Sequence, residues 1–258
     1  MKTVVVSDIH ANSTTALCPP SVLMEDGGTY KHNQAQRMLW DYWMKFCSTV
    51  PLGSLVIVNG DLVHGANARK DSQIITPNKA IMREIARRCI EPLAKRAGEI
   101  YFVRGTEWHE STGAEDLESV AASFRNTVRI GGQSSNWELW MNIYNKSFHF
   151  AHHIGMGNGS ADKEHRNAVN SFINKNQPLP DFMVRSHRHF YQPYYDNGRW
   201  LIVTPAWQLK TAFTVKVNPM SIADIGGIIF DETKGDVSWR PVLFQTPKPQ
   251  IVFPHMKK

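Results

Sequence analysis

Short apolar runs alternate with amphipathic stretches in the first half of the chain. Runs of β-branched and other apolar residues predict three buried strands, at 3–7, 54–59 and 99–104. Between them, residues 33–48 and 78–97 place apolar side chains at steps of three and four, which predicts two helices. Pro92 is expected to kink the second helix or to end its first part. Residues 114–126 predict a third helix.

The second half of the chain is richer in strand patterns. Residues 137–152 carry a long β run, and residues 161–175 have a helical pattern. Shorter strands are expected at 181–185, 199–204, 213–217, 225–231 and 236–244. Residues 11–30 are predicted to form a long loop, because they contain two adjacent prolines and two adjacent glycines.

The order of these elements predicts the fold class. A β-α-β-α-β first half followed by a mostly β second half favours an α/β fold of two packed mixed β-sheets flanked by helices, an αββα sandwich. No linker divides the chain, so residues 1–258 are expected to form a single domain. The strands within 208–258 are expected to complete the second sheet.

Composition narrows the class of protein. A chain of 258 residues that is 42% hydrophobic can bury a sizeable core, which excludes a disordered protein. Its net charge of +6 suits a polyanionic partner such as DNA or RNA but does not require one. Three scattered cysteines predict no disulfide framework. The sequence has no signal-peptide pattern and no apolar run of membrane-spanning length, so a cytoplasmic location without a membrane partner is expected.

Oxygen and imidazole side chains recur where the predicted strands end. In open α/β sheets, ligands bind at the carboxyl ends of the strands. The residues in question, in chain order, are Asp8, His10, Asp61, Glu107, His109, His152, His153, His187 and His189.

Two of these pairs have the spacing of a metal site. Asp8 and His10 are two residues apart, as are His187 and His189, and extended backbone points such residues to the same side. Carboxylate and imidazole without thiolate suit divalent Mn, Fe, Zn or Ni. Two ions about 3.5–4 Å apart need roughly six protein ligands and a bridging group. The sequence supplies that number, so it predicts two divalent metal ions.

The motif order resembles that of the calcineurin-like metallophosphoesterase family, which is D-x-H, G-D, G-N-H-[D/E], a lone H and G-H-x-H. The resemblance covers about residues 4–207. It implies hydrolysis of phosphoesters by a metal-bridging hydroxide that attacks phosphorus, with manganese the favoured metal. The roles that it implies are first-metal ligands Asp8, His10 and His189, second-metal ligands His152 and His187, a bridging Asp61, and His109 as the group that assists the leaving oxygen.

The third motif departs from the family pattern. Residues 105–110 read Gly-Thr-Glu-Trp-His-Glu, so the metal-binding Asn of the family is absent. This stretch is similar to a G-T-[E/P]-x-H variant in phage-type members of the family. Glu107 is the better candidate to replace that Asn at the second metal, and Thr106 is the lesser one. In the last motif, Ser186 replaces a Gly, which an ordinary backbone angle would allow.

Some neighbouring residues have two readings. Alternation along a strand points His152 and His153 in opposite directions, and the family places the ligand first, so His152 is favoured. His64 is expected to be a solvated loop residue, with phosphate contact as the alternative. Trp108 is expected to be a buried wall residue, with stacking on a base as the alternative. Asn12 suits a turn and a substrate hydrogen bond equally.

The substrate class follows less directly. The net charge, Arg104, Arg185, Arg188 and the basic residues within 83–96 favour a polyanion, so we expect a phosphodiesterase or nuclease. A phosphomonoesterase or protein phosphatase is one alternative, and a non-catalytic binding scaffold with the same fold is another. The natural substrate, the metal identity and the oligomeric state are left open.

Overall fold

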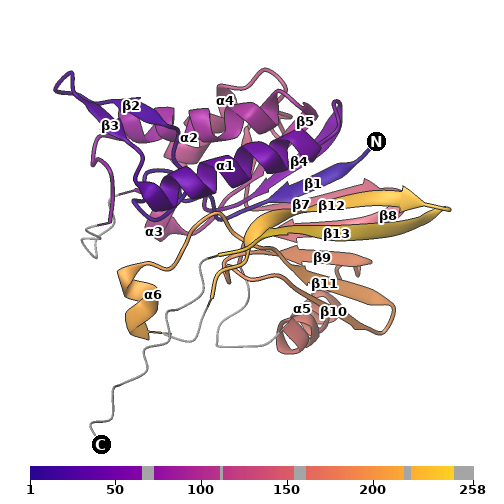
Figure 1. Ribbon diagram of the computed structural model, residues 1–258. Coiled ribbons are helices and arrows are strands. Elements are labelled where there is room, and N and C mark those ends of the chain that lie inside the picture. Colours follow the sequence, from indigo (N-terminus) through magenta and orange to yellow (C-terminus); the bar gives the residue numbers. More distant parts are fainter. Residues whose placement is uncertain (66–72, 111–112, 154–160, 218–221, 247–258) are drawn as a thin grey trace, which may run out of the picture.

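Two β-sheets lie face to face, and helices cover both outer faces (Figure 1). This is the arrangement in a computed structural model of the chain, which describes residues 1–65, 73–110, 113–153, 161–217 and 222–246. The predicted αββα sandwich with mixed sheets is therefore confirmed. In the part of the chain that the structure describes, no helix is both long enough and apolar enough to span a membrane.

The first sheet contains the strands of the first half of the chain and the last two described strands. Its order is β13 (Asp236–Phe244), β12 (Ile225–Thr233), β1 (Thr3–Val6), β4 (Ser54–Asn59), β5 (Ala97–Val103) and β6 (Ser135–Asn136). Strands β1, β4, β5 and β6 are parallel to one another, whereas β12 is antiparallel to β1. All positions of β1 and β4 are buried, as expected for parallel strands covered on both faces.

The second sheet is built from residues 138–203. Its order is β10 (Gln192–Asp196), β11 (Arg199–Val203), β9 (Phe182–Arg185), β8 (Lys146–Ala151) and β7 (Glu138–Ile143). The long β run predicted at 137–152 is a hairpin of β7 and β8, and its turn residues Tyr144 and Asn145 have φ angles of 57° and 58°. Strands β8, β9 and β11 are parallel, so the carboxyl ends of β8 and β9 lie together.

Helices close the outer faces. α1 (Gln34–Thr49), α2 (Lys79–Ala94) and α4 (Glu115–Ala122) lie on the first sheet, and α5 (Ala161–Asn174) lies on the second (Figure 1). α1 begins with a capping box, in which the side chains of Asn33 and Gln36 accept hydrogen bonds from each other's backbone N–H. α3 (Glu107–Glu110) and α6 (Ala212–Val217) are short, and β2 (Ser21–Leu23) pairs with β3 (Thr29–Lys31).

The core between the sheets is aromatic and aliphatic. Phe148, Phe150 and Phe182 of the second sheet pack with Ile57 and Phe230 of the first, and all five are nearly inaccessible to solvent. A second apolar cluster lies between the first sheet and its helices. This packing fixes the sheets relative to each other, so loops at the strand ends of both sheets can meet.

The structure corrects several expectations. Residues 213–217, predicted as a strand, belong to α6, whose first turn is capped by the Thr211 hydroxyl accepting from the Thr214 N–H at 3.1 Å. The strands within 208–258 do not complete the second sheet. β12 instead pairs with β1 in the first sheet, because it is apolar on both faces: Ile228 faces the other sheet and Ile229 faces the helices.

Other boundaries differ by less. α2 continues through Pro92 and ends at Ala94, whereas the helix predicted at 114–126 ends at Ala122. The long loop predicted at 11–30 contains most of the β2–β3 hairpin, and the pattern gave no sign of β10 or α3.

Candidate metal centre

The carboxyl ends of four strands, two from each sheet, meet in one place. Within the first sheet, the Asp8 N–H donates to the Gly60 carbonyl at 3.0 Å, and within the second the Ser186 N–H donates to the His152 carbonyl at 3.0 Å. The Asn59 side-chain amide joins the two sheets, because it donates to the Ser186 hydroxyl at 2.6 Å. The loops after β1, β4, β8 and β9 are therefore held together by hydrogen bonds.

The first group of candidate ligands is Asp8, His10 and His189. His189 Nε2 lies 3.2 Å from both Asp8 Oδ1 and His10 Nε2, and His10 Nε2 lies 3.8 Å from Asp8 Oδ1. Donor atoms around one metal ion at ordinary bond lengths lie roughly 3–4 Å apart. The three atoms thus have the mutual spacing of a coordination site.

The second group is Asp61, His152 and His187, whose ligand atoms lie within 4.8 Å of one another. His152 Nε2 is 3.2 Å from Asp61 Oδ2. The same Asp61 oxygen is 3.8 Å from His10 Nε2 in the first group, so this carboxylate lies between the two groups. His153 is exposed and belongs to neither group, which leaves His152 as the histidine of this loop that faces the centre.

The backbone at these residues is strained. Asp8, His10, Asp61, His187 and His189 all have positive φ angles, between 46° and 71°. The left-handed region costs a non-glycine residue roughly 1–2 kcal/mol. Extended backbone was predicted for the paired residues, and this prediction was wrong: they converge because the chain turns sharply after each strand. Ser186, in contrast, is not among the residues with positive φ, so the Gly of the family pattern is not needed there.

The charges of the site favour a cation. Burial opposes ionisation of Asp8 and Asp61, yet the facing histidines hold the pKa of both carboxyls below its usual range. Burial also opposes a charged His152, but Asp61 and Asp8 raise the pKa of this imidazole to about 10. The two carboxylates therefore stabilise a positive charge between them, which a divalent ion can supply in place of a proton.

The residues fit a metal ion in two further respects. Asp8 Oδ1 and His152 Nε2 are buried and have no hydrogen-bond partner among the described residues, which is costly unless something else binds them. His152 Nδ1 lies 2.9 Å from the Asn59 carbonyl oxygen, which can only accept. His152 Nδ1 therefore carries the proton, and neutral His152 presents the lone pair of Nε2 to the centre.

Comparisons with known proteins support the fold. Searches by sequence find no matching protein-family model and no matching curated protein. Among solved structures, Vps29 from Chaetomium thermophilum is similar over 96% of this chain and 100% of its own, with 10% identity and a TM-score of 0.51. The chain shares the fold of this Vps29 structure, the mixed αββα sandwich expected from the sequence.

Two other similar structures have lower TM-scores. An archaeal phosphodiesterase is 15% identical over 95% of this chain and 100% of its own, with a TM-score of 0.48. Vps29 from Entamoeba histolytica, complexed with Zn²⁺, is 10% identical over the same shares, with a TM-score of 0.47. At these identities, similarity of structure assigns no activity.

The third motif contributes to the centre through a residue other than the one favoured from the sequence. Thr106 donates to Asp61 Oδ1 from its backbone N–H at 2.6 Å and from its hydroxyl at 3.0 Å. Glu107 is exposed at the start of α3 and belongs to none of the groups of possible ligands among the described residues. Its role as a metal ligand stays a prediction, and Thr106 is the residue that contacts Asp61.

Glu110, which follows His109, is buried and links two loops. Its carboxyl group accepts hydrogen bonds from the backbone N–H groups of Gly105 and Leu62. Burial and the nearby Asp61 raise its pKa to about 8. Glu110 is the final [D/E] of the third motif, but its role in linking the two loops was not predicted from the sequence.

Two aromatic residues beside the motifs were predicted wrongly. His64, expected to be solvated, is 2% exposed, because its loop packs against the loops of His10 and His109. Trp108, expected to be buried, is 53% exposed on α3. His109 itself is half-buried, and its ring lies 4.5 Å from that of His10. Asn12 has a structural role, because its side chain bonds to the backbone of His64.

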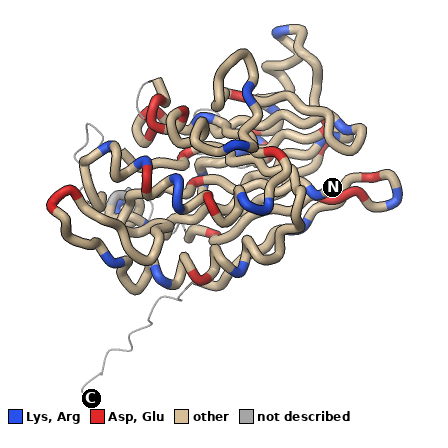
Figure 2. Tube along the Cα trace, turned by 90° about the horizontal axis from the view of Figure 1, so that it is seen from above, with Lys and Arg blue, Asp and Glu red and all other residues tan. Residues whose placement is uncertain are grey.

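The arginines expected to contact a polyanion are largely engaged within the protein. Arg185 is 4% exposed and lies beneath α5, with its guanidinium 3.0 Å from His149 and 3.7 Å from Glu164. On α2, basic side chains form ion pairs with acidic ones, such as Arg87 with Glu84. Figure 2 shows basic and acidic segments interspersed over the molecule rather than gathered into one basic surface.

Proposed function

We propose that the chain is a metal-dependent hydrolase of phosphoesters that acts on phosphodiesters with two divalent ions, manganese favoured. One observation carries the proposal. Two adjacent groups of Asp and His donors, linked by Asp61 and mostly buried, have the spacing of coordination sites, and buried Asp8 Oδ1 and His152 Nε2 have no hydrogen-bond partner among the described residues. Burying charged and unbonded polar atoms together costs the fold free energy. Coordination of metal ions by the same atoms would offset that cost.

The residues then divide the work. Asp8, His10 and His189 hold the first ion, His152 and His187 hold the second, and Asp61 lies between them. Bound divalent ions lower the pKa of a water molecule and neutralise charge on phosphoryl oxygens. His109 gives a proton to the leaving oxygen, and we assign the donation to Nε2 because Nδ1 is buried. Thr106 orients Asp61 by donating to Oδ1 at 2.6 and 3.0 Å, with a longer contact of its hydroxyl to Oδ2 at 3.3 Å, and Oδ2 is the oxygen that faces both groups.

The substrate within this class is a small phosphodiester rather than a long nucleic acid. The net charge of +6 alone favours a polyanion. The ion pairs on α2 and the burial of Arg185 remove much of the basic surface that a nucleic acid needs. The nuclease reading, including that of a phage-type enzyme, therefore ranks second.

The test compares substrates and one variant. With added manganese, we expect faster hydrolysis of bis-p-nitrophenyl phosphate than of p-nitrophenyl phosphate, and little cleavage of single-stranded DNA. Asp61→Asn is expected to abolish hydrolysis while thermal unfolding of the metal-free protein stays close to wild type. The control is His153→Asn, which changes an exposed neighbour of His152 and should keep most of the activity.

Two results would contradict the proposal. A strong preference for the monoester would overturn the diesterase assignment, and full activity of Asp61→Asn would overturn the bridging role. Strong cleavage of DNA would favour the nuclease.

A binding scaffold with the same fold is a second candidate. The observation that favours it is the third motif, where the Asn of the family pattern is absent and Glu107 is exposed. Metal analysis of the purified protein separates the two candidates. A scaffold should contain well under one divalent ion per chain, whereas the proposed hydrolase should contain close to two.

A further inference from the structure

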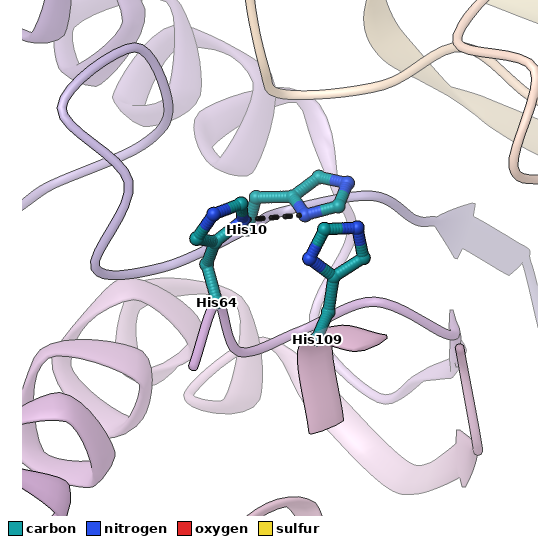
Figure 3. A group of neighbouring side chains, drawn as sticks. All are labelled: His10, His64 and His109. Atoms are coloured by element: carbon teal, nitrogen blue, oxygen red, sulfur yellow. Dashed lines mark hydrogen bonds between the residues drawn. The ribbon is translucent and has the colours of Figure 1, made fainter. Parts of the chain in front are cut away.

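His64, which is outside the proposed ligand set, contacts His10 of the first group on the side away from the other ligands. His64 is 2% exposed, and its Nδ1 is 3.3 Å from Nδ1 of His10. Figure 3 shows the rings of His10, His64 and His109 close together, with a dashed line for the contact between His10 and His64. The His64 ring centroid is 4.6 Å from that of His109. One side chain therefore contacts both a proposed ligand and the proposed proton donor.

The position of His64 is fixed by its backbone. Its N–H donates to the Ala11 carbonyl at 2.8 Å, and its carbonyl accepts from the Asn12 side chain at 2.9 Å. The next residue, Gly65, donates to the His109 carbonyl at 2.9 Å. These bonds connect the loops after β1 and β4 and helix α3. The His64 ring thus meets His10 as part of a framework of loops, and the contact is not that of a free surface side chain.

The proton on His10 explains what the contact does. Nε2 of His10 faces Asp8, Asp61 and His189, so an ion in the first group must take the lone pair of this nitrogen. Neutral His10 then carries its proton on Nδ1, and that N–H needs an acceptor. His64 Nδ1 is the ring nitrogen within hydrogen-bond distance. It can accept when the proton of His64 is on its own Nε2.

We propose that His64 is a positioning residue for the first metal ion. Its Nδ1 accepts the Nδ1–H of His10, which fixes the tautomer and the ring orientation of His10 with Nε2 aimed at the ion. This inference rests on the proposed function, because it requires an ion in the first group. It gives His64 no place among the ligands, since an ion shared by the three imidazoles would need the same His10 Nδ1 that carries the proton.

Three substitutions of His64 separate the acceptor from the bulk of the ring. In His64→Asn, Oδ1 can occupy the place of Nδ1, so the acceptor is kept. His64→Leu has a similar branched shape without an acceptor, and His64→Gln places its polar group near the position of Nε2. The metal-free full chain is titrated with Mn²⁺. Binding is monitored by calorimetry and by the paramagnetic resonance signal of free Mn²⁺.

We expect wild type and His64→Asn to bind two ions with similar affinities. His64→Leu and His64→Gln should bind one of the two ions about 10–100-fold more weakly, the loss typical when the partner of a ligating histidine is removed. Thermal unfolding of the metal-free proteins should differ little among the variants that fold. If His64→Leu does not fold, the comparison of Asn with Gln decides, because both are polar and differ in where the acceptor lies.

The outcomes distinguish this inference from the proposed function. If wild type binds no divalent ion, both fail. If wild type binds two ions and His64→Leu or His64→Gln binds both as tightly, only the role of His64 is overturned. A third equivalent of metal bound by wild type and lost in His64→Leu would also overturn it, because the three histidines would then form a cation site.

Discussion

Gly60 is the residue that brings β4 and His152 into contact. Its φ angle is +88°, and a Cβ atom at this position would collide with the His152 ring. The carbonyl of the preceding residue, Asn59, holds His152 Nδ1. The absence of a side chain at residue 60 therefore lets the second sheet place an imidazole directly against the end of a first-sheet strand.

Gly60→Ala is predicted to damage the centre as well as the fold. The positive φ alone costs roughly 1–2 kcal/mol for alanine, and the collision with His152 adds to this. The matched control is Gly53→Ala, which has a φ of +77° but no atom within 4 Å of the added Cβ. In urea unfolding, Gly60→Ala should lose more free energy of unfolding than Gly53→Ala. In Mn²⁺ titrations, only Gly60→Ala should bind the metal more weakly than wild type. Equal effects in the two variants would contradict this account.

The candidate ligands could be predicted from the sequence because they follow strands that are themselves easy to recognise. Asp8 and Asp61 each follow a fully buried apolar strand after one intervening residue, and such strands leave little choice of register. The exposure of His64 and Trp108 could not be predicted, because it depends on which distant loops cover them. Nor did the local pattern reveal that the paired ligands have left-handed backbone.

At the level of elements, helix α5 covers a polar network on the second sheet in which His149 and Arg185 are buried and Glu138 is exposed. His149 of β8 is 3% exposed and lies between Trp140 of β7 and Phe172 of α5. Its Nδ1 lies 3.0 Å from the Arg185 guanidinium and its Nε2 lies 2.9 Å from Glu138. Neutral His149 satisfies both neighbours, because Nδ1 accepts from the arginine and Nε2–H donates to the carboxylate.

This network predicts a loss of stability in acid. Burial and Arg185 lower the pKa of His149 to about 4, against the opposing effect of Glu138. The unfolded chain binds the proton near its ordinary pKa of about 6.5. The contribution of neutral His149 is therefore complete above pH 6.5 and is lost as the pH falls to 4 and below. It amounts to roughly 3–4 kcal/mol at most, from about 1.4 kcal/mol per pKa unit.

The measurement is the free energy of unfolding from pH 7 to pH 4, in wild type and in His149→Gln. The variant should start less stable, because it loses packing, and should show a shallower decline over this range. Equal declines in the two proteins would assign the acid sensitivity to other groups.

The elements themselves were predicted unevenly, for a physical reason. The bounds of α1 and β4 were predicted to within one residue. The apolar positions of α1 recur at steps of three and four throughout, and β4 contains one continuous apolar run. α6 was predicted as a strand, because a short apolar run fits a strand and a short helix equally well. The hydrogen bond that caps the helix joins Thr211 and Thr214, and threonine is also common in strands. The place of β12 beside β1 depends on contacts more than 200 residues apart, which local patterns do not contain.

At the level of the whole molecule, the candidate centre joins the two sheets. Asp8, His10 and Asp61 come from loops of the first sheet, whereas His152, His187 and His189 come from loops of the second. The first group combines Asp8 and His10 of the first sheet with His189 of the second. The second group combines Asp61 of the first sheet with His152 and His187 of the second. The packing of the sheets is thus what assembles the centre, and this link between fold and function is the central claim.

The most direct test is a crystal structure of the protein grown with Mn²⁺, with anomalous scattering measured at the manganese absorption edge. The account predicts two anomalous peaks about 3.5–4 Å apart. One should lie among Asp8, His10 and His189, the other among His152 and His187, and Asp61 should contact both. No peak in this region, or peaks only at surface carboxylates, would contradict the account.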